Sequence, residues 1–271
     1  MMNLMYCGND KVFDGILISL LSIRKHTEEP ITAYILTMAL TDVKSTYTYF
    51  TEEHATYLQD MLQEKNRLSR VIVLDIGPKF RNEMMASNNL KTSYTPYTLA
   101  RLYASEFDNM PERILYLDTD TVAKEDISAI FDIDISEYEM AGASDYLGRW
   151  FIDLNYMNAG VLYLNMNKIR ETKIFEKARE MCRTKRMWFP DQTSLNKLIK
   201  KKCFLPMKFN EQRKVRKDTV IRHFCKSIRW LPFYHTVNVK PWECERMHTV
   251  YKEHSFDDIL EEYLTRISKL K

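Results

Sequence analysis

Two periods of hydrophobic residues alternate along the chain. Short runs of branched apolar residues have the length and composition of buried strands, and apolar residues spaced three to four apart are typical of helices. The predicted strands cover residues 4–7, 31–38, 71–76, 114–117, 139–143 and 160–164. The predicted helices cover residues 16–23, 51–68 with Thr51 as N-cap, 96–107, 168–183 and 191–202.

This order of strands and helices predicts an α/β fold with a mainly parallel sheet that helices cover on both faces. No internal repeat or linker divides residues 1–271, so we expect one domain. In such folds ligands bind where the strands end at their carboxyl edge. The polar residues after 4–7 and after 114–117 should therefore share one site.

The last segment, residues 255–270, predicts an amphipathic helix with acidic residues at its start and basic residues at its end. Its apolar stripe consists of Phe256, Ile259, Leu260, Tyr263, Leu264 and Ile267. We expect this helix to pack on the core. A helix that lies on a membrane or binds a partner is the alternative, which the weakly basic polar face disfavours.

Composition narrows the class of protein. Hydrophobic residues make up 45% of the 271 residues, which is enough for a folded core. The net charge of +3 is too balanced to predict nucleic-acid binding. Five cysteines without CxxC spacing are typical of reduced thiols, and no signal peptide or long apolar run stands out, so we expect a cytoplasmic protein.

Asp118 and Asp120 come directly after the apolar run 114–117. In extended chain the two carboxylates face the same way and repel each other, and a divalent cation would relieve that repulsion. Two solvated aspartates that open a turn are the simpler interpretation. Haloacid-dehalogenase phosphatases also place a DxDx[TV] sequence after a strand, with the first aspartate, here Asp118, as nucleophile.

Six segments bear on this choice. They are YCGNDKVFDGILISLLSI, TLARLY, YLDTDTVAKEDI, MNAGVLYLNMNKIRE, PDQTSLN, and IRHFC followed by VKPW. In this order they resemble the motifs of family-8 glycosyltransferases, the group that contains glycogenin and bacterial lipopolysaccharide galactosyltransferases. The resemblance runs from residue 5 to about residue 242.

The resemblance implies a GT-A fold, a UDP-sugar donor, Mn²⁺ or Mg²⁺, and retention of anomeric configuration. It assigns nucleotide and metal binding to residues 1–127, sugar and acceptor binding to 128–245, and the terminal helix to 246–271. The metal ligands it implies are Asp118, Asp120 and His223. The nucleotide-binding residues are Tyr6, Asn9, Asp10, Asp118 and Thr119. The sugar-binding residues are Asp145, Asn158, Gly160, Asp191 and Gln192, and the catalytic ones are Asp191, Gln192 and Arg101. His223 and Arg101 could also be an ordinary core histidine and a helix-surface charge.

The chain departs from the family pattern after His223. Lys226 replaces a glycine, and Lys240-Pro241-Trp242 follows an insert over residues 227–239. By spacing, Arg229 takes the place of the family lysine, so Lys226, Arg229 or Lys240 could neutralise the diphosphate.

The function that we expect is transfer of a glucose or galactose unit to a glycan, glycolipid or protein acceptor. A basic cluster around residues 200–202 and 213–217 is most simply a solvated face, and the alternative is a contact for anionic lipid or a phosphorylated glycan acceptor. The alternatives are the phosphatase and a catalytically silent module that binds a nucleotide sugar.

Overall fold

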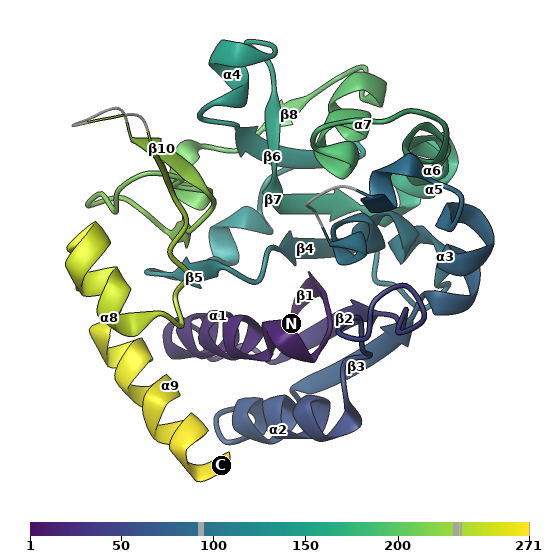
Figure 1. The fold of residues 1–271 in the computed structure, drawn as a ribbon. Helices are drawn as coiled ribbons and strands as arrows, with labels where there is room; N and C mark the ends of the chain where they lie inside the picture. Colours follow the sequence, from purple (N-terminus) through teal and green to yellow (C-terminus); the bar gives the residue numbers. More distant parts are fainter. Residues whose placement is uncertain (92–94, 230–232, 234, 271) are drawn as a thin grey trace.

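The computed structural model describes residues 1–91, 95–229, 233 and 235–270, and Figure 1 shows their arrangement. A sheet of seven strands runs through these residues in the order β3-β2-β1-β4-β7-β6-β8. The strands are β1 Met2–Cys7, β2 Ile31–Thr37, β3 Arg70–Asp75, β4 Arg113–Leu117, β6 Met140–Ser144, β7 Met157–Asn165 and β8 Cys203–Phe204. β3, β2, β1 and β4 are parallel, and β7 is antiparallel to both β4 and β6. The mainly parallel sheet that the sequence predicts is confirmed.

Helices pack on both faces of this sheet (Figure 1). Side chains of β1 alternate between the two cores, since Leu4 and Tyr6 join one and Met5 and Cys7 join the other. The first core includes α1 Phe13–His26, α2 Glu52–Gln63 and α9 Asp257–Leu270. The second includes α3 Gly77–Met84, the 3₁₀ helix η3 Pro96–Glu106, α5 Met166–Thr172, α6 Ile174–Thr184 and α7 Pro190–Leu198.

Some predicted boundaries are wrong. The helix predicted over 168–183 is two helices, because Lys173 adopts a left-handed conformation with φ 53°. The helix predicted to reach residue 68 ends at Gln63, and η3 is a 3₁₀ rather than an α-helix.

The sequence patterns also missed α3 and a group of shorter elements. These are η1 Asp10–Val12, η2 Asn88–Lys91, η4 Ser128–Ile130, α4 Gly148–Phe151, η5 Met207–Phe209, α8 Cys244–Arg246 and the π-helix η6 Met247–Tyr251.

Two small antiparallel pairs lie outside the main sheet. β5 Thr121–Ala123 pairs with β9 Ile221–His223, and β10 Ser227–Arg229 pairs with β11 His235–Val237. Both strands of the second pair lie within the 227–239 insert. The first pair matters more for function, because it joins the segment after β4 to a segment about one hundred residues later in the chain.

The C-terminal helix α9 crosses beside α1 and α2 in Figure 1. Its apolar residues Ile259, Leu260 and Tyr263, together with Phe256 before it, are buried in the first core. The helix therefore packs on the core, as expected. In the part of the chain that the structure describes, no helix combines the length and apolar character needed to span a bilayer.

Ion pairs among four charged side chains connect α9 to α1 and to the end of α2. Arg24 contacts Glu64 at 2.9 Å and Glu262 at 2.6 Å, and Arg266 contacts the same two glutamates at 2.5 and 2.9 Å. Hydrogen bonds from Arg266 and Arg24 lower the pKa of Glu64 to about 2. Because the folded-state pKa lies below the ordinary value, this contribution to stability is complete above about pH 4.5 and is lost as the pH falls toward 2.

We predict that Glu64→Gln lowers the free energy of unfolding at pH 7 by about 1 kcal/mol, a small value because Glu64 is half-exposed. Urea denaturation of both proteins across the acid range should show the difference shrinking below about pH 4.5. The exposed Glu53 of the same helix is the matched control, as Glu53→Gln. A deficit for Glu64→Gln that persists unchanged to pH 2.5 would contradict this account of the ion pairs.

Candidate active site

The predicted site residues after β1 and after β4 lie at the same edge of the sheet. The two strands are parallel neighbours, with Met5 opposite Tyr116. Asn9 and Asp10 follow β1, and Asp118 and Asp120 follow β4, so both pairs emerge at the carboxyl edge.

Backbone hydrogen bonds hold the Asp118–Asp120 turn on two sides. The Asp118 N–H donates to the Gly160 carbonyl at 2.7 Å, which ties the turn to β7. The Phe224 N–H donates to the Asp120 carbonyl at 2.9 Å, and Thr121 pairs with His223 across β5 and β9. The antiparallel pair therefore brings His223 beside the two aspartates.

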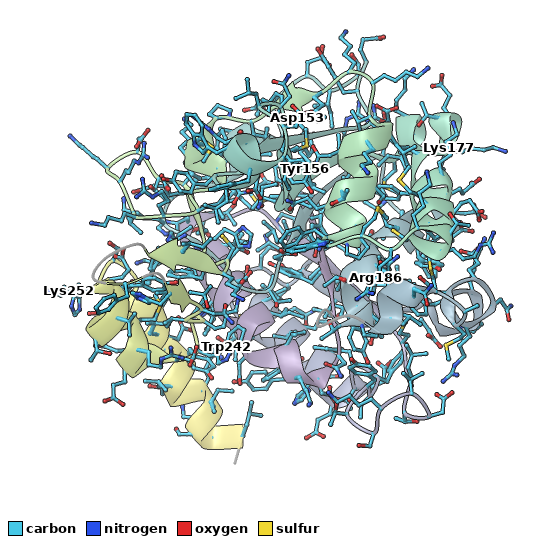
Figure 2. The ribbon with its side chains drawn as sticks, turned by 45° about the horizontal axis from the view of Figure 1, so that its top comes forward. Asp153, Tyr156, Lys177, Arg186, Trp242 and Lys252 are labelled. Carbon is cyan, nitrogen blue, oxygen red and sulfur yellow. The ribbon has the colours of Figure 1, made fainter. Side chains whose placement is uncertain are left out.

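Gly15 allows α1 to pack directly against this turn. A Cβ at residue 15 would lie 2.3 Å from the Thr119 carbonyl oxygen and 2.7 Å from the Trp242 ring. Trp242 lies beside α1 in Figure 2. The backbone of Thr119 is thus fixed between α1 and the sheet.

Asp118, Asp120 and His223 form one cluster, in which one ligand atom from each residue lies within 4.8 Å of the others. The His223 Nε2 atom is 3.2 Å from Asp120 Oδ1 and 3.5 Å from Asp118 Oδ2. His223 and Asp120 are buried, and Asp118 is partly exposed. Two carboxylates and an imidazole around one point form a donor set that suits a divalent metal, so the residues fit the ion that the sequence predicts.

Lys240 also reaches this cluster. Its Nζ atom contacts Asp120 Oδ2 and donates to the Phe224 carbonyl at 3.2 Å. Burial by itself would raise the pKa of Asp120, but His223 and Lys240 outweigh it and hold that pKa well below the usual range. Asp120 therefore stays ionised.

Arg101 lies inside the site rather than on a helix surface. Its guanidinium donates to Asp118 Oδ1 at 3.0 Å, contacts Asp191 Oδ2 at 3.3 Å and also binds the Ala159 carbonyl. Only 4% of Arg101 is exposed. It joins two carboxylates that would otherwise repel each other. Burial raises the pKa of Asp191 and Arg101 opposes that shift, with a net increase.

Tyr116 completes the surroundings of Asp118, and sequence reasoning did not identify it. Its hydroxyl donates to Asp118 Oδ1 at 2.5 Å, and its ring packs 4.0 Å from the Arg101 guanidinium carbon. Burial raises the pKa of Tyr116 well above its ordinary value, so the hydroxyl keeps its hydrogen and donates.

The predicted sugar-binding residues form a second, adjoining group. Asn158 Nδ2 donates to Asp145 Oδ2 at 2.8 Å, and Gln192 Nε2 donates to the same oxygen at 3.1 Å. Gln192 Oε1 accepts from the Ala159 N–H at 2.9 Å. The structure thus brings together Asp145, which follows β6, Asn158 of β7 and Gln192 of α7.

Gly160, which the resemblance assigns to sugar binding, has a different contact in the structure. A Cβ at this position would lie 2.1 Å from Cε1 of His223 and within 2.8 Å of both ring nitrogens. The absence of a side chain at residue 160 is therefore what admits the His223 imidazole to the cluster.

The structure differs from the expected nucleotide contacts in part. Tyr6 is fully buried and its hydroxyl lies 3.0 Å from Ser19 Oγ, so packing in the core keeps it from contacting a base. Asn9 is buried and donates to the Thr46 carbonyl at 3.0 Å. Asp10 Oδ1 accepts from the Thr51 N–H at 2.8 Å and lies 2.8 Å from His54 Nδ1.

Two of the three predicted diphosphate cations can be placed. Lys240 contacts Asp120, whereas Lys226 is exposed. The side chain of Arg229 lies outside the part of the chain that the structure describes.

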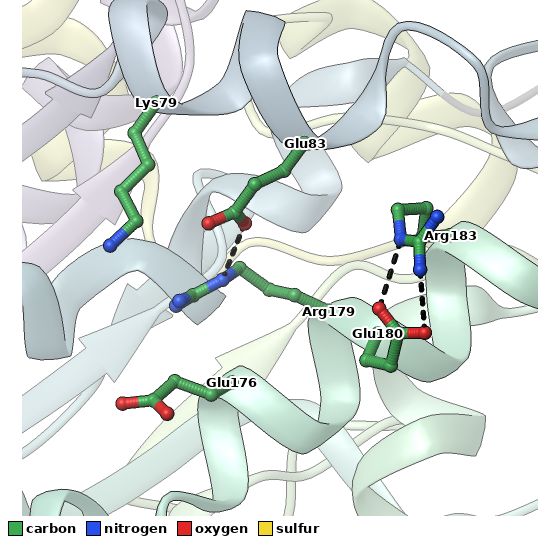
Figure 3. A pocket seen from close by; sticks show the side chains of 6 residues that line it. All are labelled: Lys79, Glu83, Glu176, Arg179, Glu180 and Arg183. Atoms are coloured by element: carbon green, nitrogen blue, oxygen red, sulfur yellow. Dashed lines mark hydrogen bonds and ion pairs between the residues drawn. The ribbon is translucent and has the colours of Figure 1, made fainter.

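A charged pocket of about 320 Å³ lies between α3 and α6 (Figure 3) and shares no residue with this site. Its lining includes Arg179, which contacts Glu83 at 2.9 Å, and Arg183, which contacts Glu180 at 2.7 Å. These contacts make it an ion-pair network between two helices.

Residues 3–245 match the sequence model of the family described as Glycosyl transferase family 8. The chain therefore belongs to glycosyltransferase family 8, and the resemblance inferred from the motifs is confirmed. The haloacid-dehalogenase alternative is wrong, since the chain belongs to a different family.

Curated relatives are similar over part of their length. A putative glycosyltransferase of Haemophilus influenzae is 26% identical over 77% of this chain and 63% of its own. The lipopolysaccharide 1,2-glucosyltransferase of Escherichia coli is 29% identical over 52% of this chain and 48% of its own. The lipopolysaccharide 1,3-galactosyltransferase of Salmonella typhimurium is 30% identical over 44% and 42%. The chain spans less than two thirds of the length of these relatives.

Solved structures show the fold. The galactosyltransferase LgtC in complex with donor and acceptor sugar analogues is similar over 96% of both chains, with TM-score 0.71 and 18% identity. The bifunctional glycosyltransferase WbbM matches 97% of this chain and 49% of its own, with TM-score 0.69 and 16% identity. The fold is the GT-A fold that the sequence predicts.

We predict that Gly160→Ala weakens Mn²⁺ binding at least about tenfold, because the added methyl group must displace the His223 ring. Isothermal titration with Mn²⁺ measures the affinity directly. Gly142→Ala is the matched control, since its Cβ would also press on buried side chains, with Leu162 and Met157 the nearest, but not on His223. Equal Mn²⁺ affinity in Gly160→Ala and the wild type would show that His223 is not a ligand.

Proposed function

We propose that this chain is a metal-dependent, retaining glycosyltransferase that moves glucose or galactose from a UDP-sugar to a glycan, glycolipid or protein acceptor. The cluster of Asp118, Asp120 and His223 at the carboxyl edge of the sheet is the observation that carries the proposal. Family membership and relatives named for lipopolysaccharide glucosyl and galactosyl transfer support it.

In this proposal Asp118, Asp120 and His223 hold Mn²⁺ or Mg²⁺, and the nitrogen ligand favours Mn²⁺. Held there, a divalent ion would supply positive charge for the diphosphate as it leaves. His223 comes from the 128–245 segment, so the metal site draws on both halves of the chain and not only on residues 1–127.

Lys240 is the diphosphate cation that we favour over Lys226 and Arg229. It is held beside Asp120 and is partly buried, so its charge acts on the diphosphate with little screening by water. Burial is the largest single effect and lowers the pKa of Lys240, but Asp120 and the other nearby groups together raise it above its ordinary value, so the ammonium keeps its proton. The nucleotide residues in this proposal are Asn9, Asp10 and the backbone of Thr119.

The donor sugar lies against Asp145, Asn158, Asp191 and Gln192 in this proposal. As the sugar's C1–O bond breaks, the electron pair stays on the departing phosphate oxygen. An acceptor hydroxyl then attacks C1 from the same face, and that phosphate oxygen takes the hydroxyl proton. Retention follows without a covalent intermediate.

Asp191 is the nucleophile in the competing double-displacement route. Its carboxylate contacts the buried Arg101 guanidinium. This contact favours a role for Asp191 in positioning Arg101 and Asp118 rather than in attacking the sugar. A glycosyl adduct trapped on Asp191 would overturn the same-face route.

The acceptor in this proposal is reached at the inner surface of a membrane, by a cytoplasmic protein with peripheral contact. This membrane contact is proposed because of the basic residues at 200–202 and 213–217, which would face anionic lipid or a phosphorylated glycan.

The test is donor binding and hydrolysis over a panel of UDP-, GDP- and CMP-sugars, with Mn²⁺ and with EDTA. We expect one UDP-sugar to raise the melting temperature and to be hydrolysed slowly only when metal is present. Stabilisation by a UDP-sugar without any hydrolysis or transfer would favour the silent binding module. No stabilisation by any nucleotide sugar would contradict the proposal.

We predict that Lys240→Met lowers kcat about 10²- to 10³-fold, since a cation that stabilises transition-state charge is lost. Mn²⁺ affinity should hold or rise, because the ammonium that contacts Asp120 is removed. Lys226→Met, which changes an exposed lysine of the same segment, is the control and should keep wild-type kcat. A kcat loss in Lys226→Met with none in Lys240→Met would reverse the assignment.

A further inference from the structure

We propose that Asn210 is a positioning residue that fixes the hydrogen of His223 on Nδ1 and so keeps Nε2 free to bind metal. This inference rests on the proposed metal site and adds a residue that the sequence motifs do not contain. It follows from a chain of hydrogen bonds, called the line below, in which a carboxylate at one end determines which group donates and which accepts at every step.

The line begins at Asp145. An ionised carboxylate only accepts hydrogen bonds, so the group that Asn158 presents to Asp145 Oδ2 at 2.8 Å must be its NH₂. Asn158 Oδ1 then faces the other way and accepts from the Gly160 N–H at 2.9 Å. A backbone N–H only donates, so both ends of Asn158 agree on one amide orientation.

Asn210 receives its orientation from Asn158. Its Nδ2 donates to Asn158 Oδ1 at 2.9 Å, which leaves its Oδ1 facing the His223 Nδ1 atom at 3.1 Å. An amide oxygen only accepts, so Nδ1 must carry the hydrogen. The tautomer of His223 is thus determined by Asp145, through the two hydrogen-bonded amides of Asn158 and Asn210.

The consequence appears at the other ring nitrogen. With hydrogen on Nδ1, Nε2 is the nitrogen that faces Asp120 Oδ1 at 3.2 Å and Asp118 Oδ2 at 3.5 Å, and its lone pair is available to a metal once Nε2 carries no hydrogen. Three electron-rich atoms then face one another, and a cation is what this arrangement binds. Ligating histidines commonly have their second nitrogen fixed by such a partner.

Burial makes the line of hydrogen bonds rigid. Asn210 is fully buried, and Asn158 and His223 are 6% and 3% exposed. Next to Asn210, the backbone carbonyl of Glu211 accepts from the His223 N–H at 3.0 Å, which holds the segment against β9. Water therefore does not replace Asn210 as a partner for Nδ1.

The same line connects the two parts of the proposed site. Asp145 Oδ2 also accepts from Gln192 Nε2 at 3.1 Å, so the predicted sugar contacts share a carboxylate with the line that ends at the metal ligand. Asn210 is the link between them.

The first test is ¹⁵N NMR of the metal-free protein labelled at histidine, with His223→Gln to identify the His223 signals among the six histidines. At about pH 8 we expect Nδ1 of His223 to carry hydrogen in the wild type. In Asn210→Leu, neutral His223 should instead carry its hydrogen on Nε2, donating to the aspartates. A wild-type Nδ1 without hydrogen would overturn the inference.

The second test is Mn²⁺ affinity by titration calorimetry. Asn210→Leu should bind Mn²⁺ about 10- to 100-fold more weakly than the wild type. Asn210→Asp keeps an acceptor for Nδ1 and loses only the donor to Asn158, so it should bind Mn²⁺ with near wild-type affinity. Wild-type Mn²⁺ affinity in Asn210→Leu would overturn the inference.

Asn165→Leu is the matched control, because Asn165 is equally buried but lies at the opposite end of β7 and donates to the Ile135 carbonyl. It should lose stability and keep Mn²⁺ affinity.

Failure of this inference and failure of the proposed function can be told apart. A wild-type protein that binds neither Mn²⁺ nor any UDP-sugar would refute the proposed function, while the tautomer of His223 seen by NMR decides the role of Asn210 by itself.

Discussion

The close approach of Asp118, Asp120 and His223 is the constraint on which the rest of the site depends. Two like charges about 4 Å apart repel by about 4 kcal/mol at an effective dielectric constant near 20. The chain offsets that cost with Arg101 on the side of Asp118 and with Lys240 on the side of Asp120. With these two cations beside the carboxylates, one ligand atom from each of the three residues lies within 4.8 Å of the others.

Residues far apart in the sequence form this cluster. A short strand pair and two glycines bring them together, rather than a long sequence motif. The pairing of β5 with β9 carries His223 to Asp120, and Gly160 makes room for its ring. Gly15 lets α1 lie against the turn that holds Thr119. Each feature would be lost by adding a single methyl group or by breaking a short strand pair.

The sequence predicted the elements with strong periodicity and the residues that carry charge. The strands around residues 4–7 and 114–117 and the aspartates that follow them could be found this way, because burial and repulsion leave a clear pattern. Asn210 could not, because its partners Asn158 and His223 come from other elements, and Tyr116 could not, because the sequence does not show that its hydroxyl turns toward Asp118 and its ring toward Arg101. The break at Lys173 was missed because nothing in the sequence marks a lysine as left-handed, and the full burial of Tyr6 was missed because spacing does not tell which face of β1 it occupies.

The central claim is that one divalent ion binds between Asp118, Asp120 and His223. Anomalous diffraction from crystals grown with Mn²⁺ tests it most directly. The account predicts a single strong anomalous peak within ligand distance of both carboxylates and of His223 Nε2. His223 Nδ1 should be hydrogen-bonded to Asn210. A crystal saturated with Mn²⁺ that has no peak there, with Lys240 still on Asp120, would contradict it.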